Sequence, residues 1–271
     1  MTRQTGRIWA CAFLGLMGAL SPVSAHEFWL EPQDFTVAPD SEITADLRVG
    51  QNFKGDAFPF IPSRFQSFMR YDHLGEISIE GTAGDIPALT VSPRGEGLTI
   101  VTYVSVGQQL LFRDWVKFGE YLALEGLDTV AARHDARGLP RDRITEIYTR
   151  CAKTLINVGD ASNDQDHATG MQLELIAGQN PAALTPGAEM SFTLLWEGQP
   201  SANRQVALFR RDDKGDALRT LTRTDDNGVA RFIIATAGTY LAAAVQMTEP
   251  SADQDVDWQS FWASLSFGVE D

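Results

Sequence analysis

Apolar and polar side chains alternate along much of this chain, which is the pattern of β-strands buried on one face. Residues 43–49 place an apolar side chain at every second position and end at Gly50. Residues 98–106 (LTIVTYVSV) form a β-branched run bounded by Gly97 and Gly107. Because β-branched residues favour strands and glycine commonly ends them, we predict that both segments are strands of an antiparallel sheet.

Two segments change to a helical spacing. Residues 114–126 place apolar side chains three or four positions apart and end at Gly126, a residue type that commonly terminates helices. Residues 143–158 carry a second stripe at similar spacing, made of Ile144, Ile147, Cys151 and Leu155. We therefore predict two helices inserted into an amino-terminal β domain.

A polar, acidic stretch without large apolar side chains follows at residues 159–170, and it predicts a linker. Beyond it, short apolar-alternating runs are separated by turn signals such as Asp225-Asp226-Asn227-Gly228. The predicted strands are residues 171–176, 190–196, 205–210, 218–224, 229–235, 239–246 and 262–269. Their number and spacing are typical of an immunoglobulin-like or transthyretin-like β-sandwich. The chain is thus predicted to be mostly β, with a β domain carrying the helical insertion at 26–160, a linker at 161–170 and a sandwich at 171–271.

The first 25 residues have the pattern of a secretory signal peptide. Arg3 and Arg7 give a basic start, an apolar run extends over residues 8–20, and small residues occupy 23–25. The run is too short to span a bilayer. We expect cleavage to leave His26 as the first residue of a periplasmic or secreted protein. Its α-amine and its ring nitrogen would then form a chelate for one transition-metal ion.

Composition narrows the classes of partner. The formal net charge is −14, and removal of two arginines with the signal makes the mature chain more acidic still. This charge argues against nucleic acid or anionic lipid as a partner, because both would be repelled. No second apolar run approaches membrane-spanning length, so we expect no direct insertion into a membrane. Cys11 leaves with the signal, so Cys151 has no partner for an intramolecular disulfide.

Few other residues are candidates for metal binding or catalysis. His73 and His134 are the candidate further metal ligands beside His26, although each is also read as an ordinary surface histidine; His167 lies in the predicted linker and is expected to be solvated. Cys151 has basic neighbours but lies on an apolar stripe, which favours a buried structural cysteine.

Hydrolase, zinc-protease, phosphate-loop and dinucleotide motifs are missing from the sequence. The aromatic residues 28–29, 258 and 261–262 fit core packing, and alternatively a sugar-stacking surface.

Five ordered motifs together resemble one family across the whole mature chain. They are HEFWLEP (26–32), GQNFKGD (50–56), KFGEYLALEGLD (117–128), YTRCAKTLINVG (148–159) and WQSFWASLSF (258–267). The family comprises bacterial periplasmic proteins described as auxiliary substrate-binding components of nickel and cobalt uptake systems. The resemblance implies a nickel or cobalt ligand role for His26 and a metal uptake transporter as the membrane partner. It also implies a histidine in a V-H-M pattern where this chain has Val245-Gln246-Met247, so the second domain's contribution to a metal site is in question.

The sequence therefore predicts a binding protein for a divalent transition metal, with nickel or cobalt favoured and copper possible. No general base or nucleophile stands beside His26 in these patterns, which favours binding over turnover. One alternative is a copper mono-oxygenase of the histidine-brace kind, which requires a second histidine close to His26. The other is a structural or carbohydrate-binding sandwich protein.

Overall fold

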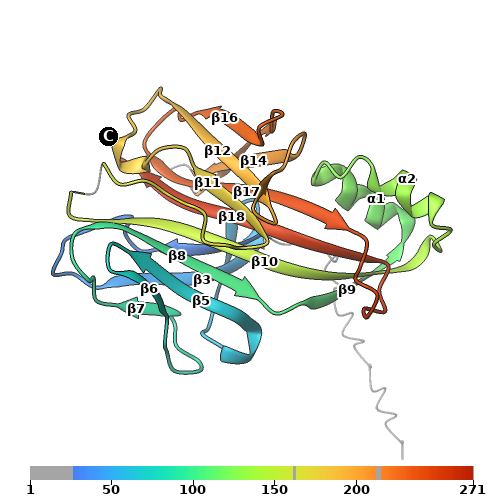
Figure 1. Cartoon of the computed structure of the whole chain (residues 1–271), viewed down its shortest axis with the longest axis horizontal. Coiled ribbons are helices and arrows are strands. Elements are labelled where there is room, and N and C mark those ends of the chain that lie inside the picture. The colour runs from blue at the N-terminus through green and yellow to red at the C-terminus, as the bar shows by residue number, and fades with distance from the viewer. Residues whose placement is uncertain (1–26, 161–162, 212–214, 271) are drawn as a thin grey trace, which may run out of the picture.

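The computed structural model describes residues 27–160, 163–211 and 215–270. The fold is mostly β, as predicted, with the helices gathered at one end of the molecule (Figure 1). The signal segment and His26 lie outside the described residues, so the predictions made for them remain predictions.

The amino-terminal strand belongs to a small four-stranded sheet. Its members are β1 (Glu27–Pro32), β3 (Ile43–Gln51), β4 (Lys54–Phe58) and β7 (Leu89–Val91). β3 confirms the strand predicted from the alternation at residues 43–49. β1 runs antiparallel to β3, with Glu27 opposite Gly50 and Pro32 opposite Ala45.

A ten-stranded sheet forms the centre of the molecule, and its long strands β10 and β18 lie side by side in Figure 1. In spatial order the main path is β15 (Ala217–Arg223), β14 (Gln205–Arg211), β17 (Gly238–Thr248), β18 (Trp258–Val269), β10 (Asp142–Val158), β8 (Gly97–Ser105), β5 (Phe65–Asp72) and β6 (Gly75–Ser78). β2 (Thr36–Val37) and β9 (Gln108–Asp114) also pair with β10. β8 confirms the strand predicted between Gly97 and Gly107.

The third sheet covers one face of the carboxy-terminal half of this central sheet. It contains β11 (Leu173–Ala177), β12 (Glu189–Trp196), β13 (Gln199–Pro200) and β16 (Val229–Ile233). Its inward side chains, such as Phe192 and Phe232, pack with Tyr240 and Phe267 of the central sheet in one buried cluster. Two sheets packed face to face confirm the predicted β-sandwich, and each strand predicted beyond residue 170 is present with shifted ends.

The helical prediction is half correct. α1 (Trp115–Leu124) forms where predicted, and Asp114 caps it by accepting a hydrogen bond from the Lys117 backbone N–H at 2.9 Å. The second helix, α2 (Val130–Ala136), follows directly and was not predicted. The prediction of a helix over residues 143–158 is wrong, because this segment is the strand β10. Single 3-10 turns occur at Pro62–Arg64 and Pro181–Ala183.

The ten-stranded sheet contains strands from both sides of the predicted linker, so the two segments do not form separate sheets. The described part of the linker is mostly exposed, with Asp166 as a buried exception. Its carboxylate pairs with the fully buried Lys153 at 3.1 Å, and Glu174 pairs with the same ammonium group at 2.6 Å. The interpretation of the whole linker as solvated is therefore wrong at Asp166. Among the described residues, no helix is both long and apolar enough to cross a membrane.

Candidate metal site beside the first residue of strand β1

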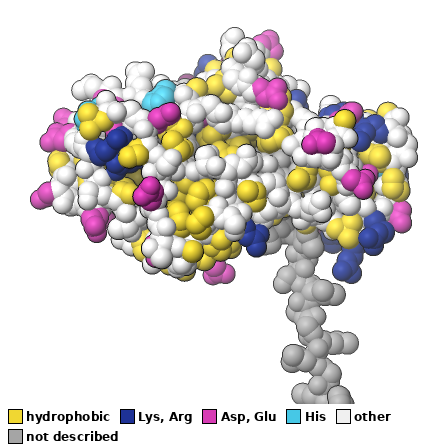
Figure 2. Space-filling view, turned by 60° about the horizontal axis from the view of Figure 1, so that its bottom comes forward, with side chains coloured by type: hydrophobic (Ala, Val, Ile, Leu, Met, Phe, Trp, Pro, Cys, Tyr) yellow, Lys and Arg dark blue, Asp and Glu magenta, His cyan; other side chains and the backbone are white. Residues whose placement is uncertain are grey.

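The structure does not bring His73 and His134 together, and His26 lies outside the described residues. His73 lies exposed in the turn after β5, and His134 is fully buried in α2. Figure 2 shows histidine side chains at one end of the molecule and a gathering of basic side chains at the other, where the helices lie. Among the described residues, no group of three or more histidine, cysteine or acidic side chains has the arrangement of a metal site.

His134 has no free nitrogen to offer a metal in this conformation. The indole N–H of Trp258 donates to His134 Nδ1 at 3.0 Å, and an indole nitrogen can only donate. The proton of the neutral ring is therefore on Nε2, which lies 3.0 Å from the carbonyl oxygen of Pro140. The ring thus connects α2 to β18, and these contacts favour a structural role for His134 over the predicted role as a metal ligand. His167 is exposed, as predicted.

The remaining sequence candidates are structural. Trp29, Trp258 and Phe261 are almost completely buried, which supports the core-packing interpretation of the aromatic motifs. Burial raises the pKa of the Cys151 thiol to about 11, so the thiol stays protonated at neutral pH. Because the thiolate is the reactive form, Cys151 is a buried structural cysteine, as the apolar stripe indicated.

A small cavity lies directly beside the first described residue. Its volume is about 20 Å³, enough for a single water molecule or ion. The carboxyl-bearing residues that line it are Glu27, from β1, and Glu125, which follows α1. Arg219 of β15 and Ser264 of β18 complete its polar lining. These four polar residues therefore come from four segments that are distant in sequence.

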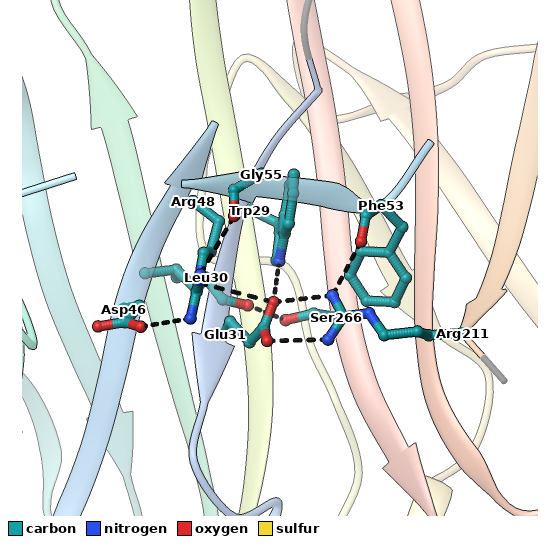
Figure 3. A network of polar contacts seen from close by, with 9 residues as sticks. All are labelled: Trp29, Leu30, Glu31, Asp46, Arg48, Phe53, Gly55, Arg211 and Ser266. Atoms are coloured by element: carbon teal, nitrogen blue, oxygen red, sulfur yellow. Dashed lines mark hydrogen bonds and ion pairs between the residues drawn. The ribbon is translucent and has the colours of Figure 1, made fainter. Parts of the chain in front are cut away.

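A polar network anchors β1, and with it Glu27, to the central sheet (Figure 3). The two guanidinium N–H groups of Arg211 donate to the two carboxylate oxygens of Glu31 at 2.9 and 3.0 Å. The Trp29 indole donates to Glu31 Oε2 at 2.6 Å, and Arg211 also donates to the Phe53 carbonyl at 2.9 Å. Such two-pronged arginine–carboxylate pairs fix orientation as well as distance. Glu27 therefore lies at the end of a strand that is anchored by its own side chains as well as by its pairing with β3.

Glu125 is held by the end of α1. It occupies the carboxy-terminal cap position, and its N–H donates to the Tyr121 carbonyl at 3.1 Å. The neighbouring Leu124 carbonyl accepts hydrogen bonds from Arg219 at 2.9 Å and from the Gln205 side chain at 2.8 Å. The negative end of the helix dipole disfavours a carboxylate here, so a nearby cation would be stabilising.

Both carboxyl groups titrate near neutral pH. Burial raises the pKa of Glu27 to about 7, against the lowering effect of backbone hydrogen bonds and of Arg219. Burial likewise raises the pKa of Glu125 to about 7, and the charge of Glu27 adds to this rise while that of Arg219 opposes it. Two acids and one guanidinium leave a net negative site when both acids are ionised. The cavity can therefore take a cation in exchange for protons.

Several polar atoms around this cavity are buried without a hydrogen-bond partner. They are Glu27 Oε2, Arg219 Nε and the hydroxyl oxygen of Ser264. Ser264 is only 6% exposed, so its hydroxyl has little access to bulk water. An unmade hydrogen bond in the interior costs about 1–3 kcal/mol. Glu27 Oε2 and the Ser264 hydroxyl oxygen could interact with a bound cation, whereas Arg219 Nε–H can only donate a hydrogen bond to a water molecule or an anion.

Sequence reasoning missed this cavity because Glu27 and Glu125 look like ordinary surface acids in a chain with 36 of them. The available signal was that both acids stand inside motifs that carry the family resemblance. The resemblance also drew attention to Gln246, but that residue faces away from the cavity. Its neighbour Val245 lines the cavity, and successive side chains of a strand point to opposite faces.

Comparison with known proteins identifies one family for this chain. Residues 23–248 match the family described as a domain of unknown function (DUF4198). Among curated proteins, none matches. Similar solved structures include the D0-D1 domain of intimin, at 12% identity and a TM-score of 0.22, with 89% of this chain and 97% of that chain covered. Another is a tetra-tandem repeat in the extending region of a large adhesion protein, at 10% identity and a TM-score of 0.23, with 91% and 50% covered.

Proposed function

Because the chain belongs to the DUF4198 family, whose function is unknown, we propose a function from its site: binding of one divalent transition-metal ion beside the start of β1. In this proposal His26 supplies its α-amine and ring nitrogen after the signal is removed. Glu27 and Glu125 supply carboxylate oxygens.

The observation that carries the proposal is the convergence of distant motifs on one ion-sized cavity. HEFWLEP contributes Glu27, KFGEYLALEGLD contributes Glu125, and WQSFWASLSF contributes Ser264. GQNFKGD lies beside them, because Gly50 pairs with Glu27 across β3 and β1. Motifs used only for packing have no need to meet at a cavity with two half-buried acids and unpartnered oxygen atoms.

The donor set suits a borderline metal. An imidazole and an amine nitrogen favour nickel, cobalt, copper or zinc over magnesium or calcium, and carboxylates complete the shell. The family resemblance favours nickel or cobalt among these ions, with copper as a further possibility. It also supports a role in metal uptake, in which the periplasmic or secreted protein presents the ion to transporter components in the membrane.

The test compares metal affinity in matched variants of the mature protein beginning at His26. We expect Ni²⁺ binding by titration calorimetry to weaken by about tenfold or more in Glu125→Gln, because a ligand charge is lost. Glu120→Gln is the control on the same helix, since Glu120 is exposed and pairs with Lys117 at 2.7 Å. One residue added before His26 should also weaken binding, because it converts the α-amine into an amide. The affinity of the mature protein should fall from pH 8 to pH 6, where protons compete for the same groups.

Two results would contradict the proposal. Equal affinities of the extended and mature proteins for Ni²⁺ would mean that the α-amine is not a ligand. An unchanged affinity in Glu125→Gln would mean that the cavity is not the binding site. The mono-oxygenase alternative has less support, because none of the histidines in the described ranges lines the cavity. Reductant-dependent oxygen consumption by the copper-loaded protein would favour it.

A further inference from the structure

A much larger cleft lies on the opposite face of the central sheet. Its volume is about 570 Å³, within the range of small-molecule sites. Phe261 lines this cleft, whereas the next residue of β18, Trp262, lines the cavity beside Glu27. Alternation along the strand therefore separates the two sites by the thickness of the sheet. An inference drawn from the cleft is independent of the metal proposal.

The walls of the cleft are polar but uncharged. None of the described residues that line it is acidic or basic, although the chain has 22 basic and 36 acidic side chains. Four glutamines stand around it: Gln66, Gln172, Gln254 and Gln259. The hydroxyl-bearing Ser67 and Thr149 add further donors and acceptors. Such a lining offers no counter-charge to an ionic ligand, so it selects for a neutral one.

One of these glutamines has a side-chain oxygen without a hydrogen-bond partner. Gln254 Oε1 is buried and has no hydrogen-bond partner. The Cys151 thiol at the same cleft stays protonated, because burial raises its pKa to about 11, so it adds no charge. A ligand hydroxyl that donates a hydrogen bond to Gln254 Oε1 would give this oxygen its missing partner. A neutral ligand needs no counter-charge from the surrounding side chains.

We propose that this cleft binds a neutral saccharide of one or two sugar units. A primary amide both donates and accepts, and so does a sugar hydroxyl, so glutamines match a polyhydroxylated ring without charge. Val104, Ile147 and Met171 supply apolar surface for the C–H faces of the ring. A peptide fits less well, because peptide recognition on a sheet commonly uses a free strand edge. The facing edges of β10 and β18 are already paired with each other from Glu146 to Thr154.

The experiment uses the full mature protein and ligand-observed NMR. Glucose, N-acetylglucosamine, maltose and cellobiose are the neutral probes, and glucuronate and glucosamine are their charged counterparts. We expect saturation transfer to at least one neutral probe and at least a tenfold weaker response to the charged ones. Gln254→Leu removes the unpartnered amide, and Ser67→Trp fills the cleft from β5, so each should abolish the signal. Gln179→Leu is the matched control, since Gln179 is exposed and lies outside the cleft.

Circular dichroism and thermal unfolding establish that each variant is folded. The two cleft variants change different walls of the cleft, so if one fails to fold, the other still tests the proposal. The proposal is overturned if no neutral probe gives saturation transfer at millimolar concentration. It is also overturned if charged probes bind equally well, if the folded cleft variants bind like the wild type, or if only a blocked neutral tripeptide binds.

Discussion

At the residue scale, a fully buried carboxyl group makes the stability of this protein depend on pH. Glu146 lies in β10, and its Oε1 accepts hydrogen bonds from the Tyr121 hydroxyl at 3.2 Å and from the Ser260 hydroxyl. Its other oxygen has no partner. Burial raises the pKa of Glu146 to about 7, against the lowering effect of these two hydrogen bonds.

The sign of the pH dependence follows from which state holds the proton. Between pH 4.5 and 7 the folded protein keeps a proton on Glu146 that the unfolded chain has released, so stability falls as the pH rises. Above pH 7 both states are ionised, and the full loss of about 3 kcal/mol remains. Glu146→Gln cannot ionise, so we expect a flatter stability profile. Urea unfolding at pH 5, 6, 7 and 8 measures it, and a slope equal to that of the wild type would contradict a buried, titrating Glu146.

At the scale of elements, the end of α1 shows how a local sequence signal specifies structure. Gly126 follows the cap residue with φ of 65°, a conformation that disfavours other residues. A β-carbon there would also lie 2.7 Å from Gln205, the residue that caps the Leu124 carbonyl. At Gly119, inside the same helix, an added β-carbon would meet no atom of the described residues within 4 Å beyond the helix backbone itself.

These two glycines give opposite predictions for the same substitution. Gly126→Ala should destabilise the protein by about 1–2 kcal/mol, because of backbone strain and the close contact. Gly119→Ala should stabilise it by up to about 1 kcal/mol, because alanine favours the helix interior. Thermal or urea unfolding of both variants checks the pair. If Gly126→Ala proved as stable as Gly119→Ala, the described end of α1 would be wrong.

Strand β10 shows where a local signal fails. Ile144, Ile147, Cys151 and Leu155 have helical spacing, but residues 151–158 are all buried, because both faces of the central sheet are covered there. Burial on both faces removes the alternation that identifies a strand. The remaining signal was composition, since Thr and Ile, which favour strands, each occur three times in this segment. α2 was missed because it has only seven residues and lacks a side-chain cap.

The candidate site was predictable only in part, for a related reason. The proposed role of His26 follows from a local pattern, the signal-peptide junction. The placement of Glu27 and Glu125 at one cavity depends on how β1 and the end of α1 lie over the same face of the central sheet, and no local pattern encodes that placement. For His134 the sequence suggested a metal ligand, and only the structure reveals that its Nδ1 accepts a hydrogen bond from the Trp258 indole.

At the scale of the whole molecule, the long strands β10 and β18 unite the two segments on either side of the predicted linker. They pair in parallel over nine residue pairs, from Glu146 with Trp258 to Thr154 with Ser266. Lys153 of β10 also forms buried ion pairs with Asp166, inside that linker, and with Glu174, beyond it. Breaking a buried pair costs about 3–5 kcal/mol, so these contacts oppose separation of the segments.

We therefore predict that cutting the linker leaves one folded particle. A specific protease site inserted after Asp160 allows a single cut, and the uncut insertion protein is the control. The two fragments should elute together from a sizing column in native buffer, because the sheet hydrogen bonds between β10 and β18 do not depend on the covalent connection. They should separate in denaturant, where those bonds are lost. Separate elution in native buffer would mean that residues 26–160 and 171–271 are independent domains. The cavity proposed to bind a metal ion, which draws Glu27 and Ser264 from different fragments, would then be lost on cleavage.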